Sequence, residues 1–196
     1  MNITPFQALA CPLDGAPLRR NDSTWRCAAG HSFDIASQGY THLLPVQKKR
    51  SRDPGDSKEM VAARRRFLNA GHYQPIAAAV SRAALADLAP GATASCLDAG
   101  CGEGYYLRQL AAATSDLKTL ALLGLDISKW AILSAAKQDQ RPNWVVGSNA
   151  TCGSKRSKAA GSSGERAAAW SLLSRKLATP PLWAEAMLAS SAASSA

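Results

Sequence analysis

A glycine-rich turn is the segment of this chain best suited to chemistry. Asp98 ends an apolar stretch, and Gly100, Gly102 and Gly104 follow it at every second position. Because glycine lacks a Cβ atom, such a turn lets the backbone approach a bound ligand closely. A second apolar stretch ends at Asp126, where a carboxylate can accept hydrogen bonds from two ribose hydroxyls. Together these residues predict an S-adenosylmethionine site.

A nicotinamide cofactor is the main alternative ligand for this turn. Its usual pattern is G-x-G-x-x-G, whereas this chain has G-x-G-x-G directly after an acid. The Asp98 carboxylate can order the loop and meet the ammonium group of the methionine moiety, which favours the methyl donor. A turn that only connects a strand to a helix is the purely structural alternative.

Two pairs of potential metal ligands form a second candidate site. Cys11 and Asp14 are separated by two residues, and Cys27 and His31 by three. Turn-forming residues between the pairs predict a hairpin that brings them together. Zinc is favoured because thiolates and imidazole hold it tightly, with aspartate as a less usual fourth ligand. A metal-free hairpin, in which Asp14 only caps the turn, stays open as the alternative.

Alternating strands and helices must position the glycine turn. The pattern predicts strands near residues 93–98, 119–125 and 143–147, with helices near 104–113 and 128–138. Two further helices are predicted at 57–70 and 75–88. This alternation is typical of βαβ units on a parallel sheet. We therefore predict an α/β protein in which a small zinc-ribbon-like module precedes a partial Rossmann-type class I methyltransferase domain.

The chain divides into four parts. Residues 1–50 are the predicted zinc-finger-like module, to which the family resemblance described below assigns rRNA binding. Residues 51–92 are a basic linker with helices, 93–150 the partial S-adenosylmethionine-binding methyltransferase domain, and 151–196 a low-complexity tail. The tail has 12 Ala and 10 Ser among 46 residues, and no Val, Ile, Phe or Tyr. Such a segment is not expected to supply strands of a buried sheet. We therefore expect a three-stranded sheet with an open edge, and little or no turnover.

Charge and composition narrow the class of partner. The 196 residues carry a formal net charge of +9, with basic runs at 48–52 and 64–66. Lysine and arginine facing phosphates gain affinity by releasing counterions, so nucleic acid is the favoured partner. A solvated basic surface is the alternative. Trp25 and Tyr40 are expected either to stack on unpaired bases or to pack in the small module.

The number of cysteines and the length of the apolar segments indicate the cellular compartment in which the protein is expected. Five cysteines are an odd number, and two of them lie beside the glycine turn, which does not suit a disulfide framework. No apolar run reaches the length needed to cross a bilayer, and the first residues lack the pattern of a leader. We expect a cytoplasmic protein with no membrane contact.

Several longer motifs resemble the bacterial 23S rRNA (guanine-N1)-methyltransferases. They are Cys11-Pro-Leu, Trp25-Arg-Cys27, Leu43-Leu-Pro-Val-Gln47, Lys49-Arg-Ser-Arg-Asp-Pro-Gly-Asp-Ser57, Ala70-Gly-His-Tyr73-Gln-Pro75 and residues 98–106. The resemblance covers about residues 8–150. It implies zinc and S-adenosylmethionine as cofactors, a 23S rRNA hairpin as substrate, and a homodimer. The family carries cysteine where this chain has Asp14.

The resemblance also implies site residues and a reaction. Tyr73, Gly102 and Glu103 would contact the cofactor, although Tyr73 could instead only pack between elements. The methyl group would go to N1 of a guanine; no catalytic base is identified. Two alternatives remain: a zinc-dependent RNA-binding module without catalysis, and a product of a gene whose reading frame shifts near residue 150.

Overall fold

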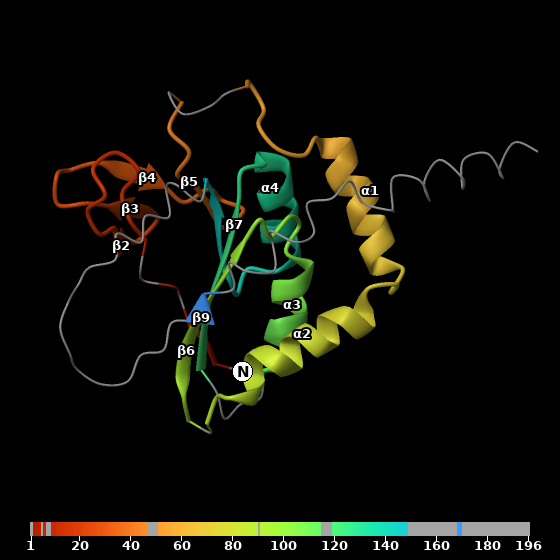
Figure 1. The fold of residues 1–196 in the computed structure, drawn as a ribbon. Coiled ribbons are helices and arrows are strands. Elements are labelled where there is room, and N and C mark those ends of the chain that lie inside the picture. The colour runs from red at the N-terminus through yellow and green to blue at the C-terminus, as the bar shows by residue number, and fades with distance from the viewer. Residues whose placement is uncertain are drawn as a thin grey trace, which may run out of the picture.

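The computed structural model describes residues 2–4, 6, 9–46, 51–89, 91–114, 119–148 and 168–169. A parallel sheet forms the centre of the molecule, with four helices on one face and a small antiparallel sheet on the other (Figure 1). This arrangement confirms the prediction of a zinc-ribbon-like region followed by a partial Rossmann-type α/β region.

The parallel sheet is built around three strands that agree with the predicted ones. They are β6 (Thr93–Ala99), β7 (Thr119–Asp126) and β8 (Asn143–Val146). The register places Asp98 opposite Gly124 and Asp126 opposite Val146. Since the strands are parallel, both acids lie at the same edge of the sheet, where ligands bind in open α/β folds.

Four helices cover one face of this sheet. They are α1 (Lys58–Asn69), α2 (Gln74–Ala86), α3 (Tyr105–Ala113) and α4 (Lys129–Gln138). Serine hydroxyls cap two of them: Ser57 accepts a hydrogen bond from the Met60 amide at 3.3 Å, and Ser128 accepts one from the Ala131 amide at 3.2 Å. Such caps satisfy amides that lack partners inside the helix and explain why these helices begin where they do.

The amino-terminal region is divided differently from the predicted module of residues 1–50. Only β2 (Arg19–Asn21), β3 (Thr24–Arg26) and β4 (Ser32–Asp34) form the antiparallel ribbon sheet. In contrast, β1 (Asn2–Thr4) pairs with β7 and β5 (Tyr40–His42) pairs with β8, both in parallel. The ribbon is therefore an insertion between β1 and β5 of the large sheet and not a separate domain that precedes it.

The prediction of a three-stranded parallel sheet is wrong. Within the described residues the large sheet has six strands, with β5 covering the outer edge of β8 and the two-residue β9 (Ala168–Ala169) pairing with Cys96 and Leu97. Pairing uses main-chain N–H and C=O groups, so an alanine segment can add a short strand without β-branched side chains. The rest of the predicted tail, Cys152 included, lies outside the described residues.

Two apolar clusters hold the layers together, one on each face of β7. Leu120 and Leu122 pack with the helices, whereas Leu123 and Leu125 pack with the ribbon. The alternation follows from the two-residue period of a strand. In the ribbon cluster the Trp25 side chain is only 1% exposed, so the structure excludes its proposed stacking on RNA bases. No helix of the described residues is long and apolar enough to cross a membrane.

Candidate metal and cofactor sites

The four predicted metal ligands meet at one point of the ribbon. One ligand atom from each of Cys11, Asp14, Cys27 and His31 lies within 4.8 Å of the other three. The His31 Nδ1 atom is 3.0 Å from Asp14 Oδ2, 3.3 Å from Cys27 Sγ and 3.5 Å from Cys11 Sγ. Ligands of a tetrahedral zinc ion are about 3.3–3.8 Å apart when bound at about 2.0–2.3 Å. The spacing and the donor set therefore fit zinc.

Two tight turns bring these ligands together. In the first, the Gly15 amide donates to the Cys11 carbonyl at 2.8 Å; in the second, the Gly30 amide donates to the Cys27 carbonyl at 3.0 Å. Both glycines have positive φ, +77° and +88°, where side chains are disfavoured. The ligand pairs are thus positioned by their own short loops, and β2 and β3 bring the two loops face to face.

Asp14 uses its two carboxylate oxygens for different tasks. Oδ1 accepts a hydrogen bond from the Ala16 amide at 2.8 Å, and Oδ2 faces the cluster. The Ala16 hydrogen bond, together with the neighbouring thiols and imidazole, lowers the Asp14 pKa to about 2. The side chain is therefore an anionic ligand held by the turn. The predicted capping role and the predicted ligand role coexist in this one residue.

The predicted cofactor turn borders a cavity of about 320 Å³. Asp98, Gly100 and Cys101 form one wall, and α2 and α3 supply apolar side chains that include Val80 and Leu107. Gly100 has φ +87°, and a Cβ atom there would meet nothing within 4 Å. The backbone at this glycine is therefore open to a ligand, as the sequence predicts for an S-adenosylmethionine turn.

The two predicted acids differ in their surroundings. Burial, and then the nearby Asp126 charge, raise the Asp98 pKa to about 6, while Arg64 acts in the opposite direction. Burial also raises the Asp126 pKa, against hydrogen bonds from the Ser128 amide at 2.8 Å and the Gly102 amide at 2.9 Å. Asp126 thus holds the glycine turn in place, and its oxygens retain lone pairs for ribose hydroxyls.

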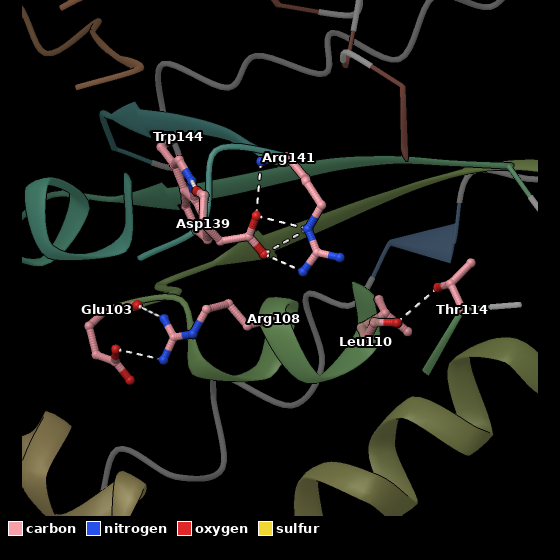
Figure 2. A network of polar contacts seen from close by, with 7 residues as sticks. All are labelled: Glu103, Arg108, Leu110, Thr114, Asp139, Arg141 and Trp144. Atoms are coloured by element: carbon pink, nitrogen blue, oxygen red, sulfur yellow. Dashed lines mark hydrogen bonds and ion pairs between the residues drawn. The ribbon is translucent and has the colours of Figure 1, made fainter. Parts of the chain in front are cut away.

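Glu103 faces the protein interior and not the cavity. Its side chain is buried, and Oε2 accepts hydrogen bonds from Arg108 Nη2 at 2.9 Å and Gln138 Nε2 at 2.8 Å. Arg108 also donates to the Glu103 carbonyl, so one guanidinium binds both the main chain and the side chain of Glu103 (Figure 2). Glu103 Oε1 has no partner among the described residues. The predicted contact between Glu103 and the cofactor remains a prediction, and it would have to be made by the main chain because the side chain faces the interior.

Gly104 is required by packing. A Cβ atom there would lie 2.4 Å from Trp144 Cη2, and one on Gly124 would lie 2.3 Å from Trp144 Cζ3. The indole fills the space left by both glycines and donates from Nε1 to the Asp139 carbonyl at 2.6 Å (Figure 2). Glycine at position 104 therefore allows the Trp144 ring to pack directly against the turn.

The aromatic residue predicted to contact the cofactor lies near the cavity. Tyr73 is half-buried and packs edge-on against Phe67, with ring centroids 5.4 Å apart. Its neighbour Tyr106 lines the cavity itself, a position that the sequence reasoning did not single out. Both the packing role and the cofactor role of Tyr73 are compatible with this placement.

The sequence reasoning also missed a docked loop. The segment that begins the predicted basic linker at residue 51 is docked on the core, because Ser128 Oγ donates to the Asp56 carbonyl at 2.7 Å. A Cβ atom on Gly55 would lie 2.8 Å from Ser128 Cβ, so only glycine allows this approach. The Pro54-Gly55-Asp56 sequence indicates a turn, but no feature of the neighbouring residues indicates that this turn packs against Ser128.

The two thiols beside the turn, half-buried Cys96 and buried Cys101, carry no sign of nucleophilic chemistry. Burial, followed by the nearby Asp98 charge, raises the Cys96 pKa to about 11, and burial also raises the Cys101 pKa. Both thiols therefore stay protonated near neutral pH, as expected for packing residues.

Basic side chains lie on the ribbon as well as on α1. Arg19 and Arg26 are opposite each other on β2 and β3, and both are exposed. Like charges directly across a strand pair are unfavourable unless an anion joins them. Arg64, Arg65 and Arg66 are exposed on α1, whereas residues 48–50 of the first basic run lie outside the described residues.

A ribbon with four clustered metal-type ligands, joined to a parallel sheet with a glycine turn, defines a zinc-ribbon protein with a partial Rossmann-type fold. Comparison with known proteins agrees: residues 9–52 match the family model described as RlmA, N-terminal, a zinc ribbon. The chain is 42% identical over 154 residues to a Micromonospora griseorubida protein that carries the name of a 23S rRNA (guanine-N(1)-)-methyltransferase, covering 70% of this chain and 50% of that protein.

Two further relatives lead to the same family. A 23S rRNA (guanine(748)-N(1))-methyltransferase of Streptomyces fradiae is 37% identical over 70% of this chain and 47% of its own length. A Bacillus subtilis protein, YxjB, that also carries the name of a 23S rRNA (guanine-N(1)-)-methyltransferase is 29% identical over 72% of this chain and 50% of its own length. The chain is thus a relative of the 23S rRNA (guanine-N1)-methyltransferases, as its motifs predicted, and spans about half the length of the curated relatives it matches.

Both cofactor predictions agree with these matches. Zinc agrees with the ribbon family and with the four-ligand cluster, and S-adenosylmethionine agrees with relatives that are methyltransferases.

Proposed function

We propose that this chain carries the donor site and part of the RNA-binding surface of an enzyme that methylates N1 of a guanine in 23S rRNA. The observation that carries the proposal is the pairing of a glycine turn and two acids at the carboxyl edge of a parallel sheet with a zinc-type ribbon on the same sheet. The named activity of the relatives supports the choice of substrate.

S-adenosylmethionine supplies an activated methyl group when it is bound. Asp98 would receive the ammonium group of its methionine moiety, Asp126 the ribose hydroxyls, and the backbone at Gly100 and Gly102 would approach the ligand without steric conflict. The apolar side chains of α2 and α3 would exclude water from the cavity. Positioning of this kind brings the reacting groups close and accounts for much of the rate of a bimolecular transfer.

The RNA would be held by the exposed arginines of the ribbon and α1. Zinc would keep the two ribbon loops rigid, so that Arg19 and Arg26 present a fixed pair of charges to phosphates. A guanine must also leave its stack before its N1 atom can reach the donor. The hairpin, the homodimer, the cytoplasmic location, the four-part organisation and the reduced turnover of the 196-residue chain remain predictions.

A transfer assay tests the proposal. The 196-residue chain would be incubated with radiolabelled S-adenosylmethionine and 23S rRNA hairpin transcripts, and N1 methylation would be located by the arrest of reverse transcription at the modified base. We expect S-adenosylmethionine to bind, and we expect little label in the RNA because reduced turnover is predicted for this chain; the label that is transferred should give one arrest at a guanine. Asp98→Ala should abolish donor binding, whereas the matched variant Asp34→Ala, at an exposed ribbon acid outside the metal cluster, should not.

The other outcomes separate the alternatives. Donor binding without transfer would support the prediction of impaired turnover. Salt-sensitive hairpin binding that survives Asp98→Ala and fails in Cys27→Ala would favour an RNA-binding module without catalysis. A chain that binds neither ligand would contradict the proposal and favour a disrupted gene product, which resequencing from about codon 140 would reveal.

A further inference from the structure

One cation reaches the predicted donor cavity from a different element. Arg64 lies on α1 but lines the same cavity as Asp98 and Gly100. Its Nε atom is 3.5 Å from the point where a Cβ atom on Gly102 would lie, so the guanidinium rests against the glycine turn. A Cβ atom at position 102 would only touch the arginine at an ordinary van der Waals distance, so the Arg64 side chain lies directly beside the turn.

The guanidinium is not committed to a protein partner. Among the residues that the structure describes, none accepts a hydrogen bond or forms an ion pair with Arg64. Its charge still acts on the cavity, since it lowers the pKa values of both Asp98 and Asp126 against the larger effect of burial. Arg64 and Asp98 both line the cavity of about 320 Å³ without pairing with each other, so a ligand in the cavity can reach both side chains.

We propose that Arg64 binds the carboxylate of the methyl donor's methionine moiety while Asp98 binds its ammonium group. This inference rests on the proposed function, because it assumes the donor site. The methionine end of the donor is a zwitterion, and two acids alone would attract its ammonium but repel its carboxylate. A guanidinium can bind a carboxylate through two parallel hydrogen bonds, which fixes orientation as well as charge.

The proposal makes α1 part of the donor site. All three arginines are exposed on α1, but Arg64 lines the cavity whereas Arg65 and Arg66 do not. Sequence reasoning placed all three arginines in one phosphate-binding run. The structure separates them, because residues on one helix point in different directions.

Calorimetry with three related ligands tests the assignment. The probes are S-adenosylhomocysteine, its decarboxylated form, which keeps the amine but lacks the carboxylate, and 5′-methylthioadenosine, which lacks the whole amino-acid moiety. The wild-type chain should prefer S-adenosylhomocysteine to the decarboxylated form by about tenfold or more, as expected for a charge-assisted hydrogen bond. Arg64→Met should reduce this preference to about one, and leave 5′-methylthioadenosine binding unchanged.

Two further variants serve as controls. Arg64→Lys keeps the charge but not the two-pronged geometry, so it should retain part of the preference. Arg82→Met removes an exposed arginine of α2 that does not line the cavity, and it should keep the whole preference. Because the wild-type preference is measured without any variant, poor folding of Arg64→Met could not hide the result.

Each remaining outcome overturns the inference in a recognisable way. If the wild-type chain binds S-adenosylhomocysteine and its decarboxylated form equally well, no carboxylate partner exists. If Arg64→Met weakens all three ligands alike, the arginine only supports the fold. If it weakens RNA hairpin binding and leaves the preference intact, Arg64 contacts phosphate. If the wild-type chain binds none of the three, the proposed function itself fails.

Discussion

The metal cluster and the donor cavity are built in opposite ways. The four metal ligands lie in two loops of five residues each, and each loop closes on itself through a glycine amide. The donor cavity instead combines α1, α2, β6 and α3, and its glycine turn is held by Asp126, which lies 24 residues further along the chain from Gly102. One site is local in sequence and the other depends on the whole sheet.

In the ribbon the metal ligands also hold the fold together, whereas at the cavity other residues hold the predicted binding groups in place. In the ribbon the ligands themselves are the staple, since a sheet of nine residues has little core of its own. At the proposed donor cavity, the turn that contains Asp98 and Gly100 is supported by residues that do not line the cavity, such as Trp144, Arg108 and Ser128. Variants of these two kinds should therefore fail differently.

The largest effect is expected from Cys27→Ala. Losing one of four ligands should reduce bound zinc from about one equivalent to nearly none, because structural zinc binding is worth about 10 kcal/mol or more. Cys27 shares an apolar cluster with Leu123 and Leu125, so the loss should reach the central strand and lower the melting temperature by about 10 °C. Metal analysis after dialysis and thermal unfolding would measure both effects.

Cys96→Ala is the matched control for Cys27→Ala, since Cys96 lies outside the metal cluster. It should keep the full zinc content. If Cys27→Ala also kept its zinc, the cluster would not be a metal site, and the contrast between the two regions would fail.

A smaller effect is expected from Gly104→Ala at the turn. The new Cβ atom would overlap the Trp144 ring, and we expect a loss of about 3 kcal/mol in the free energy of unfolding. Gly91→Ala has nearly the same φ, +78° against +77°, but open space around it, so it should cost only about 1 kcal/mol. Urea unfolding of both variants isolates the clash from the backbone strain. Equal losses would show that Trp144 does not hold the turn.

Asp98→Asn should separate stability from binding. The Asp98 pKa of about 6 lies above its ordinary value of 3.8, so the folded state favours the protonated acid. This stabilisation is present below about pH 4 and is lost as the pH rises through about 6, because the buried charge faces Asp126 and is only partly offset by Arg64.

At pH 7.5 the Asp98→Asn variant should therefore be more stable than the wild-type chain by about 1–3 kcal/mol, and the gain should vanish near pH 4. Donor affinity should nevertheless fall by about tenfold or more, since the ammonium partner is lost. Urea unfolding at both pH values and calorimetry would test this. A gain in stability that is the same at both pH values would contradict the explanation.

The smallest effect is expected from Asp14→Cys, which exchanges an oxygen ligand for a thiolate. Zinc affinity should rise by about tenfold, because soft thiolates suit zinc better. The substitution also removes the 2.8 Å hydrogen bond from the Ala16 amide, which should cost about 1 kcal/mol of binding free energy and so oppose the gain in zinc affinity. Competition with a chelator measures the affinity. A weaker site would mean that the turn matters more than the ligand type.

Much of the fold could be predicted because its signals are local. The periodicity of the apolar residues located the four helices and the strands β6, β7 and β8, and the serines at positions 57 and 128 cap their helices through neighbouring amides. The metal cluster was predictable for the same reason: two short loops with turn glycines contain all four ligands.

The missed features depend on distant pairing. β5 has three residues and no distinctive pattern, and its place beside β8 depends on main-chain pairing across about 100 residues. The buried position of Glu103 could not be read from its neighbours either, because its partner Gln138 is on α4. A charge in a glycine turn looks the same in sequence whether it faces a ligand or the interior.

The sequence by itself determined the order of the elements, the metal ligands and the acid and glycine positions of the donor turn, because turn chemistry and strand periodicity act over a few residues. Only the tertiary structure decided that the ribbon is inserted into the sheet, that Trp144 fills the space behind Gly104 and Gly124, and that Arg64 faces the donor cavity. These contacts join residues 20 to 100 positions apart, and packing of the whole core selects them.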